Sequence, residues 1–391
     1  MRSHQSLRVL YLFFLLNGFS LASWLSRTPA IRDGLSASTE LMGIILFCFS
    51  SGCMVGILSA GKLLNLKGVK ACALTGMFLL TMGLTLLASG LGAVNAYLSA
   101  AGLFIFGIGI GWAEVAINIS CAAMEREFNR SLMTLLHGFF SLGTFLGALA
   151  GMLITTSGIS PLIHLLAVSG MLLVLTLLTM RNFPASDTEQ QSDRKDSFLR
   201  QVINELMDGS LLVIGLVVLA MALAEGSAND WLPLLMIDDH GFKETQGLLI
   251  YTGFTLCMVL GRFGGTPLVN KLGKMFVLKC SAVAALIGLL TIIFLPYQVL
   301  VVFAVLLWGL GASLGFPLAL SAAGDTGTNS HLRVTIASVM GYFAFLVGPP
   351  LLGFIGGHFT LRFAMFPVAV LMLVAFIVMF ISRAKTYPHT A

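Results

Sequence analysis

Long apolar segments, separated by short groups of turn-forming and charged residues, occupy most of the chain. A membrane-spanning helix needs about 20 mostly apolar residues, and twelve segments have roughly that length. They cover residues 7–28, 41–62, 71–90, 95–121, 131–156, 160–180, 211–236, 246–268, 275–295, 298–323, 333–356 and 362–382. The pattern predicts an all-α polytopic membrane protein with twelve transmembrane helices.

One polar stretch is much longer than the others. It runs from Arg181 to Asp208, between the sixth and seventh apolar segments, and contains SDTEQQSDRKD. We expect residues 181–208 to form a cytoplasmic linker. It would join an N-terminal six-helix bundle, residues 1–180, to a C-terminal six-helix bundle, residues 209–391.

The two halves match at four anchors that are 202 to 207 positions apart. The matched residues are Trp24 with Trp231, Asn65 and Gly68 with Asn270 and Gly273, Gly107 and Gly109 with Gly309 and Gly311, and Phe139-Phe140 with Tyr342-Phe343. These anchors indicate a duplicated six-helix unit, and therefore two pseudo-symmetric bundles of the kind found in major facilitator proteins.

Composition and charge narrow the class further. Hydrophobic residues make up 57% of the chain and charged residues 10%, whereas soluble domains carry about 25% charged residues, so a soluble enzyme is excluded. The net charge of +5 does not indicate a nucleic-acid partner, because Lys and Arg sort by membrane side. With both termini inside, 18 lie in inner loops and ends and 4 in outer ones, which predicts cytoplasmic termini in a bacterial-type inner membrane.

Motifs for other chemistry are missing from the sequence. The six cysteines lie in or beside apolar segments without metal-ligand spacing, and no phosphate-binding, zinc-protease or nucleophile-elbow motif occurs. We therefore expect no cofactor, no metal site and no enzymatic activity. The expected partners are the lipid bilayer, a small solute and protons, and the expected state is a monomer.

The loop after the second segment resembles the signature loop of the major facilitator superfamily, G-x-x-x-D-R-x-G-x-R/K. Here it reads Gly61-Lys62-Leu63-Leu64-Asn65-Leu66-Lys67-Gly68-Val69-Lys70, with a shorter copy at Asn270-Lys271-Leu272-Gly273-Lys274. The family Asp is Asn65 here. The resemblance implies a gate at this membrane side, built from Gly61, Asn65, Gly68, Lys70, Asn270 and Gly273.

Three further stretches resemble the fucose:proton symporter branch and its relatives, including the rhizopine-locus membrane protein. They are GWAEVAIN (111–118), LLHGFFSLGTFLGALAG (135–151) and AEGSANDWL (224–232). The sugar symporters of that branch carry an Asp in the first helix, whereas here no Asp lies near Trp24. The resemblance implies proton-coupled symport of a sugar- or polyol-like solute.

Ionisable residues inside membrane segments are functional candidates, because a charge at a helix centre costs about 2.5–3.5 kcal/mol on insertion scales. Glu114 is expected to exchange a proton in a central cavity, or else to serve packing as a neutral side chain. Asn118, one turn further on the same face, suits solute recognition. Glu225 is the second candidate carboxylate, and Asn229 shares its face.

Three other polar residues have two interpretations each. Asp230 lies about 140° around the helix from Glu225 and is either an outer-gate partner or a solvated helix end. Arg27 is either an ion-pair partner of Asp230 or an interfacial side chain whose charge reaches water. His137 is either a proton relay or structural. For Arg262, near the end of its segment, we expect solvation or an inner-gate role.

Aromatic residues complete the candidate solute site, although packing is the usual role of an aromatic in a membrane helix. The residues expected to contact a solute are Asn17, Glu114, Asn118, Trp112, Glu225, Asn229, Tyr251, Trp308 and Tyr342. Two other functions stay open. One is proton-coupled export of an amphiphilic compound, disfavoured because Gly147-Ala148 lacks the Pro of the exporter motif. The other is a sensor that keeps the transporter fold without transport.

Overall fold

The computed structural model describes residues 2–128, 132–184, 205, 209–325 and 330–381, and all regular secondary structure in these ranges is helical. The first half contains α1 (Arg2–Leu25), α2 (Thr28–Gly34), α3 (Thr39–Gly92), α4 (Ala96–Phe128), α5 (Met133–Thr156), α6 (Pro161–Thr179) and the 3₁₀-helix η1 (Met180–Asn182). The second half contains α8 (Gly209–Asp238), α9 (Glu244–Leu272), α10 (Lys274–Phe294), α11 (Gln298–Gly324), α12 (Ser330–His358), α13 (Leu361–Ala364) and α14 (Phe366–Ile381).

Within the described residues, each of the twelve predicted segments lies mostly in helix. Eleven helices in the described ranges are long and apolar enough to cross a membrane, and α3 accounts for two predicted segments because it has 54 residues. Gly68 divides α3, with a φ of +78° that side chains rarely adopt. The glycine therefore turns the chain between the second and third crossings.

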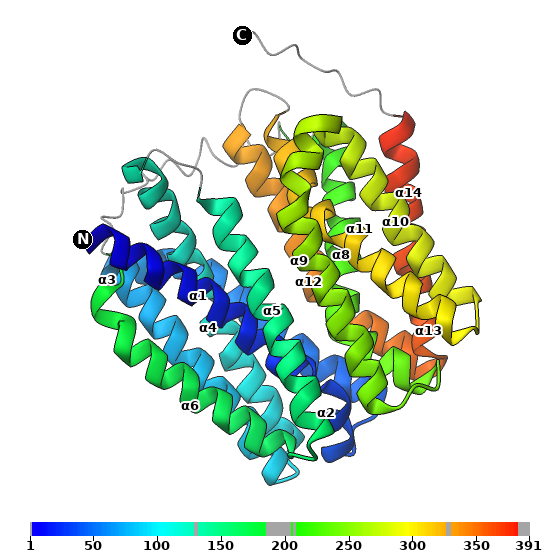
Figure 1. Cartoon of the computed structure of the whole chain (residues 1–391), viewed down its shortest axis with the longest axis horizontal. Helices are drawn as coiled ribbons and strands as arrows, with labels where there is room; N and C mark the ends of the chain where they lie inside the picture. The colour runs from blue at the N-terminus through cyan, green and yellow to red at the C-terminus, as the bar shows by residue number, and fades with distance from the viewer. Residues whose placement is uncertain (1, 129–131, 185–204, 206–208, 326–329, 382–391) are drawn as a thin grey trace.

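The helices form two groups that lie side by side (Figure 1). Within the first group α3 packs on α4 and α1 on α5; within the second, α10 packs on α11 and α8 on α12. The groups meet mainly where α3 contacts α12 and α5 contacts α9. Most of the predicted linker, residues 185–204 and 206–208, lies outside the described residues.

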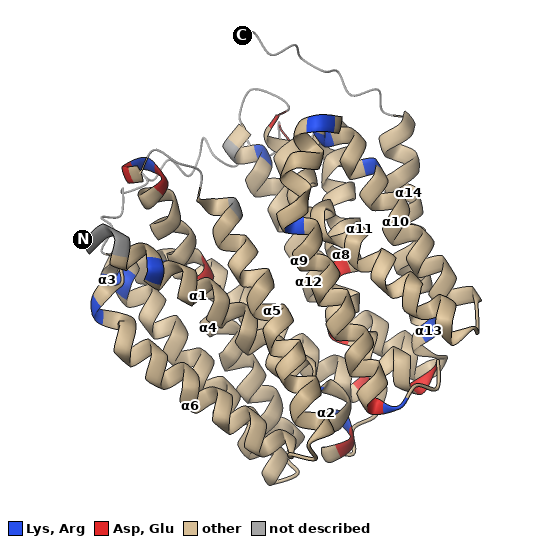
Figure 2. Ribbon diagram, viewed as in Figure 1, with Lys and Arg blue, Asp and Glu red and all other residues tan. Residues whose placement is uncertain are grey.

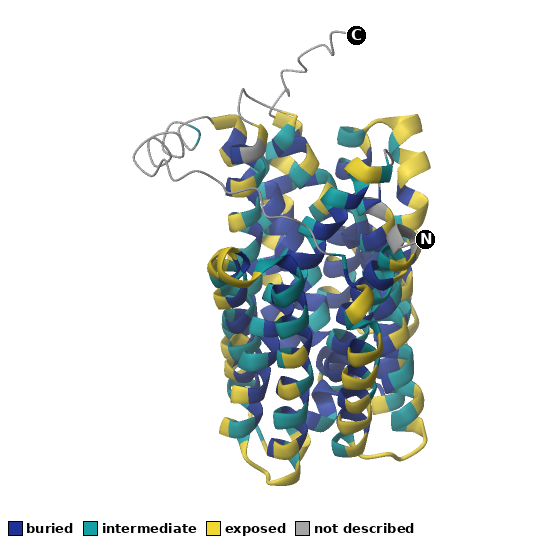
Figure 3. Ribbon diagram, turned by 90° about the vertical axis from the view of Figure 1, so that its left-hand side faces the viewer, coloured by how far each residue is buried: buried dark blue, intermediate teal, exposed yellow. Residues whose placement is uncertain are grey.

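The two ends of the bundle differ in charge. We call the end where α1 begins and α14 ends the terminus face, and the end that carries α2 and α13 the opposite face (Figure 1). Lys and Arg gather toward the terminus face (Figure 2). Large apolar side chains such as Leu178, Phe303 and Phe380 are exposed on the helices, and exposed positions recur along the outer sides of the bundle (Figure 3). A lipid environment explains this exposure.

The predicted repeat is visible in how glycines let helices approach. A Cβ on Gly107 of α4 would lie 2.3 Å from the Phe49 carbonyl oxygen of α3. A Cβ on Gly309 of α11 would lie 2.8 Å from the Phe254 carbonyl oxygen of α9. Both contacts allow no side chain, so the two glycines perform the same packing task in equivalent helix pairs.

Candidate functional site

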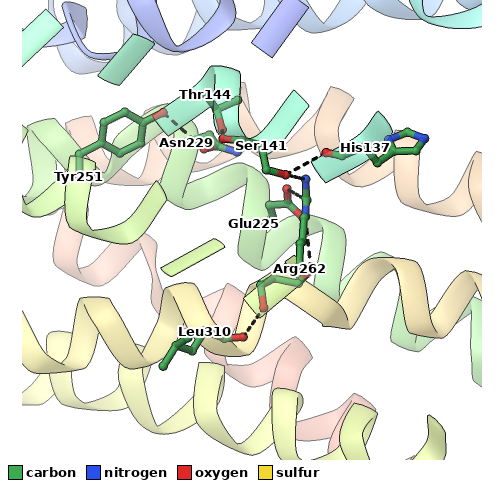
Figure 4. A network of polar contacts seen from close by, with 9 residues as sticks. His137, Ser141, Thr144, Glu225, Asn229, Tyr251, Arg262 and Leu310 are labelled. Atoms are coloured by element: carbon green, nitrogen blue, oxygen red, sulfur yellow. Dashed lines mark hydrogen bonds and ion pairs between the residues drawn. The ribbon is translucent and has the colours of Figure 1, made fainter. Parts of the chain in front are cut away.

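An ion pair lies between the two groups of helices, within the membrane-spanning part. Arg262 of α9 donates from Nη2 to Glu225 Oε1 of α8 at 2.9 Å, and from Nη1 to Ser141 Oγ of α5 at 2.7 Å (Figure 4). The Arg262 side chain is 19% exposed and the Glu225 side chain 13%. One guanidinium thus connects a carboxylate of its own group to a hydroxyl of the other group.

Further hydrogen bonds extend this network on both sides. Ser141 Oγ also donates to the His137 carbonyl oxygen at 3.1 Å, and Thr144 Oγ1 donates to the Ser141 carbonyl oxygen at 2.7 Å. Tyr251 donates from its hydroxyl to Asn229 Oδ1 at 3.4 Å. Asn229 lies one turn from Glu225 on α8, as their spacing predicted, so the polar groups of α8 face the same network (Figure 4).

A small cavity of about 30 Å³ lies beside this network. Its lining comes from α1 and α5 of the first group and α8 and α9 of the second: Leu21, Leu25, Phe140, Thr144, Glu225, Asn229, Tyr251, Thr255, Met258 and Arg262. An engineered cavity of about 150 Å³ binds a benzene molecule, so a cavity of about 30 Å³ has room for water and is too small for a sugar. A larger solute would need the groups to move apart.

Glu114 lies on α4, apart from this network. It is partly buried, and within the described residues no hydrogen bond or ion pair reaches its carboxylate. It is within electrostatic range of Cys53 on α3 and of Tyr342 on α12, across the boundary between the groups. Asn118, one turn away, has a buried side-chain oxygen to which no group in the described ranges donates a hydrogen bond. Both residues therefore offer unsatisfied polar atoms.

Arg27 and Asp230 do not form the ion pair that was one of the two interpretations of each residue, and both are buried, so the solvated alternatives are wrong as well. Arg27 donates to Thr155 Oγ1 and to the Ile159 carbonyl oxygen, at 2.8 Å for the carbonyl, because the turn between α1 and α2 directs its side chain toward α5. Asp230 is itself buried.

A neighbouring pair makes the contact between the groups instead. Arg32 of α2 forms an ion pair with Asp238 at the end of α8. Close packing lies nearby, where a Cβ on Gly43 of α3 would be 3.1 Å from the Pro349 carbonyl oxygen of α12. The two groups are thus in contact at the opposite face.

Arg262 is the main residue that the sequence interpretation missed. The solvated alternative is wrong, because the side chain is 19% exposed and its ion pair lies at the centre of the network, whereas the inner-gate role stays a prediction. The signal was present, because Arg262 falls within the apolar segment 246–268. His137, by contrast, packs its ring edge-on against Phe14 with 5.2 Å between ring centres, which fits the structural alternative.

Several predicted solute contacts lie away from the cavity. Trp112 donates from Nε1 to Ser59 Oγ at 2.8 Å, and Trp308 is fully buried against Phe254. Asn17 donates from Nδ2 to the Phe13 carbonyl oxygen at 2.8 Å. Tyr251 and Asn229 do line the cavity. These two therefore remain candidates for solute contact, whereas Trp112, Trp308 and Asn17 serve packing.

The predicted gate loops lie toward the terminus face. Gly61, Asn65 and Asn270 are exposed, and Lys70 donates to the Arg181 carbonyl oxygen at 3.3 Å. Gly273 has a φ of +85°, like Gly68 in the other half, so both halves turn on a glycine at equivalent places. The described residues include no cluster of three or more His, Cys, Asp or Glu that could hold a metal ion.

A bundle of membrane-spanning helices in two groups, with a polar site between them, defines a membrane transporter of the two-bundle type. The chain belongs to the Major Facilitator Superfamily, whose family model matches residues 9–332. This confirms both the superfamily resemblance and the twelve-helix fold predicted from the sequence.

Individual relatives support the branch resemblance. The chain is 29% identical over 363 residues to an uncharacterized MFS-type transporter of Yersinia pestis, covering 93% of this chain and 92% of the relative. It is 28% identical over 376 residues to the membrane protein MosC of Rhizobium meliloti, covering 95% and 89%. It is 24% identical over 292 residues to the L-fucose-proton symporter of Escherichia coli K12, covering 66% of each.

Solved structures share the fold. A mutant of the nucleoside transporter NupG matches with a TM-score of 0.76 at 13% identity, over 97% of this chain and 99% of that one. The Escherichia coli fucose:proton symporter FucP matches with a TM-score of 0.66 at 20% identity, over 95% and 96%. At these identities the likeness concerns the fold alone.

Proposed function

We propose that the protein is a proton-coupled symporter that carries a small polar solute, sugar- or polyol-like, across the inner membrane by alternating access. The observation that carries the proposal is the polar cavity between the two groups, which brings Glu225, Arg262 and Asn229 into an apolar interior. Such groups are costly in a membrane and mark solute or ion pathways. The relatives' names, which include an L-fucose-proton symporter, point the same way.

Glu114 is the best candidate for the proton-coupling group. No cation holds its carboxylate among the described residues, so Glu114 can take up a proton without leaving a partner charge unpaired. Protonating Glu225 would instead strand the Arg262 guanidinium, and an unpaired buried charge is strongly destabilising. Glu225 is therefore the second candidate and His137, packed on Phe14, the third.

The solute would be held by groups from both bundles. Asn118 offers an unpartnered oxygen, and Asn229, Tyr251 and Thr144 offer hydrogen-bonding groups beside the cavity. Tyr342, within electrostatic range of Glu114, would contribute from α12. The described conformation, with its contacts at the opposite face, would be the state closed on that side.

Orientation follows from charge. Because Lys and Arg gather toward the terminus face, we place that face in the cytoplasm by the positive-inside rule. A cysteine replacing Ser192, which lies outside the described residues, should react with a membrane-impermeant reagent only in inside-out vesicles. Reaction in right-side-out vesicles would show that the terminus face lies outside the cell.

The function is tested by proton movement in proteoliposomes. A thermal-shift screen of sugars, polyols, amino acids and amphiphilic drugs first identifies a binding class, since a bound ligand raises the melting temperature by mass action. That solute is then added outside vesicles with a pH-sensitive dye inside. Symport predicts internal acidification, and the exposed-carboxylate variant Glu244→Gln should behave like the wild type. Internal alkalinisation would indicate exchange, and binding without solute flux would indicate a sensor.

A further inference from the structure

Arg262 is the one Lys or Arg among the residues that line the cavity. All three of its side-chain nitrogens have acceptors: Glu225, Ser141 and, for Nε, the Ser313 carbonyl oxygen at 3.4 Å. The guanidinium is a planar fork that matches a carboxylate with two parallel hydrogen bonds. Glu225 currently fills one position of that fork.

Charge balance restricts what can replace Glu225 there. Removing the Glu225 charge by protonation leaves Arg262 without an anion in an apolar interior, which costs several kcal/mol. A neutral sugar or polyol supplies hydrogen bonds to Arg262 but no charge. A solute carboxylate supplies both, so its binding and the protonation of Glu225 favour each other.

We propose that the transported solute carries a carboxylate that replaces Glu225 as the partner of Arg262, which makes the substrate class sugar acids rather than neutral sugars. This inference rests on the proposed function of the same cavity. It adds Glu225 as a second proton-binding group beside Glu114, because a solute carboxylate paired with Arg262 removes the penalty for protonating Glu225. One proton from water adds to a Glu225 oxygen, and the solute carboxylate pairs with Arg262. The site is neutral before and after, because one negative and one positive charge have arrived together.

The surroundings of Glu225 fit this exchange. From α9 it faces Arg262 and Tyr251, and α5 contributes His137, which is within electrostatic range of Arg262. Asp230 follows five residues later on α8 itself. The lining from α1 is apolar, namely Leu21 and Leu25, and α11 offers the Ser313 carbonyl oxygen. Arg262 is therefore the cation on which the Glu225 charge depends.

The remaining lining suits a polyhydroxylated acid. Thr144, Asn229, Tyr251 and Thr255 offer hydroxyl and amide groups to solute hydroxyls, and Phe140 offers an apolar ring. At about 30 Å³ the cavity does not admit a sugar acid. The carboxylate would arrive when the two groups part and the bond from Arg262 to Ser141 breaks.

Matched solute pairs test the inference on the purified full chain. D-glucuronate is compared with D-glucose, and D-gluconate with sorbitol, because each pair differs at a carboxylate. The acid of at least one pair should bind about tenfold or more tighter than its neutral counterpart. Its affinity should fall by up to about tenfold per pH unit as pH rises and Glu225 loses its proton.

Variants separate recognition by Arg262 from a merely structural role. Arg262→Met should lose the preference for acids, Arg262→Lys should keep part of it, and Glu225→Gln should bind acids without pH dependence. Lys274→Met, at an exposed ion pair with Asp325, is the matched control and should leave the preference unchanged. In Glu225→Ala, acetate should raise the melting temperature more than chloride at equal ionic strength, and the double variant with Arg262→Met should lose this effect.

The outcomes are distinct. Neutral solutes that bind as tightly as the acids, an acid preference that survives in Arg262→Met, or no acetate effect in Glu225→Ala would each overturn the inference. If Arg262→Met does not fold, the pH dependence of acid binding by Glu225→Gln and the acetate measurement on Glu225→Ala still test the inference. A neutral sugar that moves with protons refutes the sugar-acid class and leaves the proposed function standing, whereas absence of any proton-coupled flux refutes the proposed function itself.

Discussion

Replacing Arg262 by Met should destabilise the protein by an amount that depends on pH. The substitution leaves Glu225 without its cation while preserving most of the side-chain volume. Breaking a buried ion pair in this way costs about 3–5 kcal/mol. Both side chains keep some exposure, 19% and 13%, so we expect the lower end, about 3 kcal/mol, for a Glu225 that stays ionised.

In this variant Glu225 can also lose its charge by taking up a proton, which limits the destabilisation. An ordinary carboxyl titrates near pH 4.3, and each pH unit above that value costs about 1.36 kcal/mol for protonation. At pH 7.5 protonation would cost about 4.4 kcal/mol, more than the unpaired charge, so the loss stays near 3 kcal/mol. At pH 5.5 protonation costs about 1.6 kcal/mol and limits the loss to that value. The destabilisation should therefore halve as pH falls by two units.

The assay is the free energy of unfolding by denaturant titration in mixed micelles at pH 5.5 and 7.5. The double variant Glu225→Gln with Arg262→Met carries neither charge and should be insensitive to pH over this range. Lys274→Met breaks an ion pair whose side chains are 29% and 54% exposed, so it should cost about 0–1 kcal/mol. An equal loss at both pH values in Arg262→Met would refute the reasoning, because it would mean that Glu225 keeps its charge without Arg262.

Three further predictions concern packing and gating. Gly107→Ala should lower the free energy of unfolding by about 1–3 kcal/mol, because its Cβ would lie 2.3 Å from a carbonyl oxygen of α3. The control Gly170→Ala, whose Cβ meets nothing within 4 Å, should change the unfolding free energy little. Arg32→Met should weaken closure of the opposite face by about 1 kcal/mol, seen as several-fold faster labelling of cysteines there, and Asp238→Asn should do the same; unchanged labelling would argue that this pair does not hold the face closed. Asn65→Asp should favour the state open at the opposite face by about 0.3–1 kcal/mol through the α12 helix dipole, and accessibility probes that report no change at either face would rule out a gate at this residue.

The fold was predictable because membrane crossing demands long apolar segments. Each predicted segment coincides with a helix, and Gly68, Gly107 and Gly309 occupy the turns and close contacts that their repeated positions indicated. These features depend on local composition and spacing, which a sequence contains. The boundary between α3's two crossings was predicted for the same reason.

The polar contacts were harder to predict, because they depend on how helices rotate against each other. Glu225 and Asn229 were expected on one face of α8 from their spacing, and both line the cavity. Arg262 was missed because its partner is 37 residues away and on another helix. Arg27 and Asp230 were paired by depth alone, but the turn after α1 directs Arg27 toward Thr155. The depth of a residue in the membrane follows from its position in the sequence. The direction in which its side chain points within the bundle depends on how the helices are rotated against each other.

Counterflow and accumulation by the Glu114→Gln variant in proteoliposomes test proton coupling most directly. Gln imitates a permanently protonated Glu114, so the variant should bind solute and exchange it across the membrane at rates near those of the wild type. It should not accumulate solute under an imposed pH gradient, because position 114 can no longer release the proton that resets the carrier. Glu114→Ala should be weaker in both assays, and the exposed control Glu244→Gln should resemble the wild type in both. Normal accumulation by Glu114→Gln would contradict the account and transfer the coupling role to Glu225 or His137.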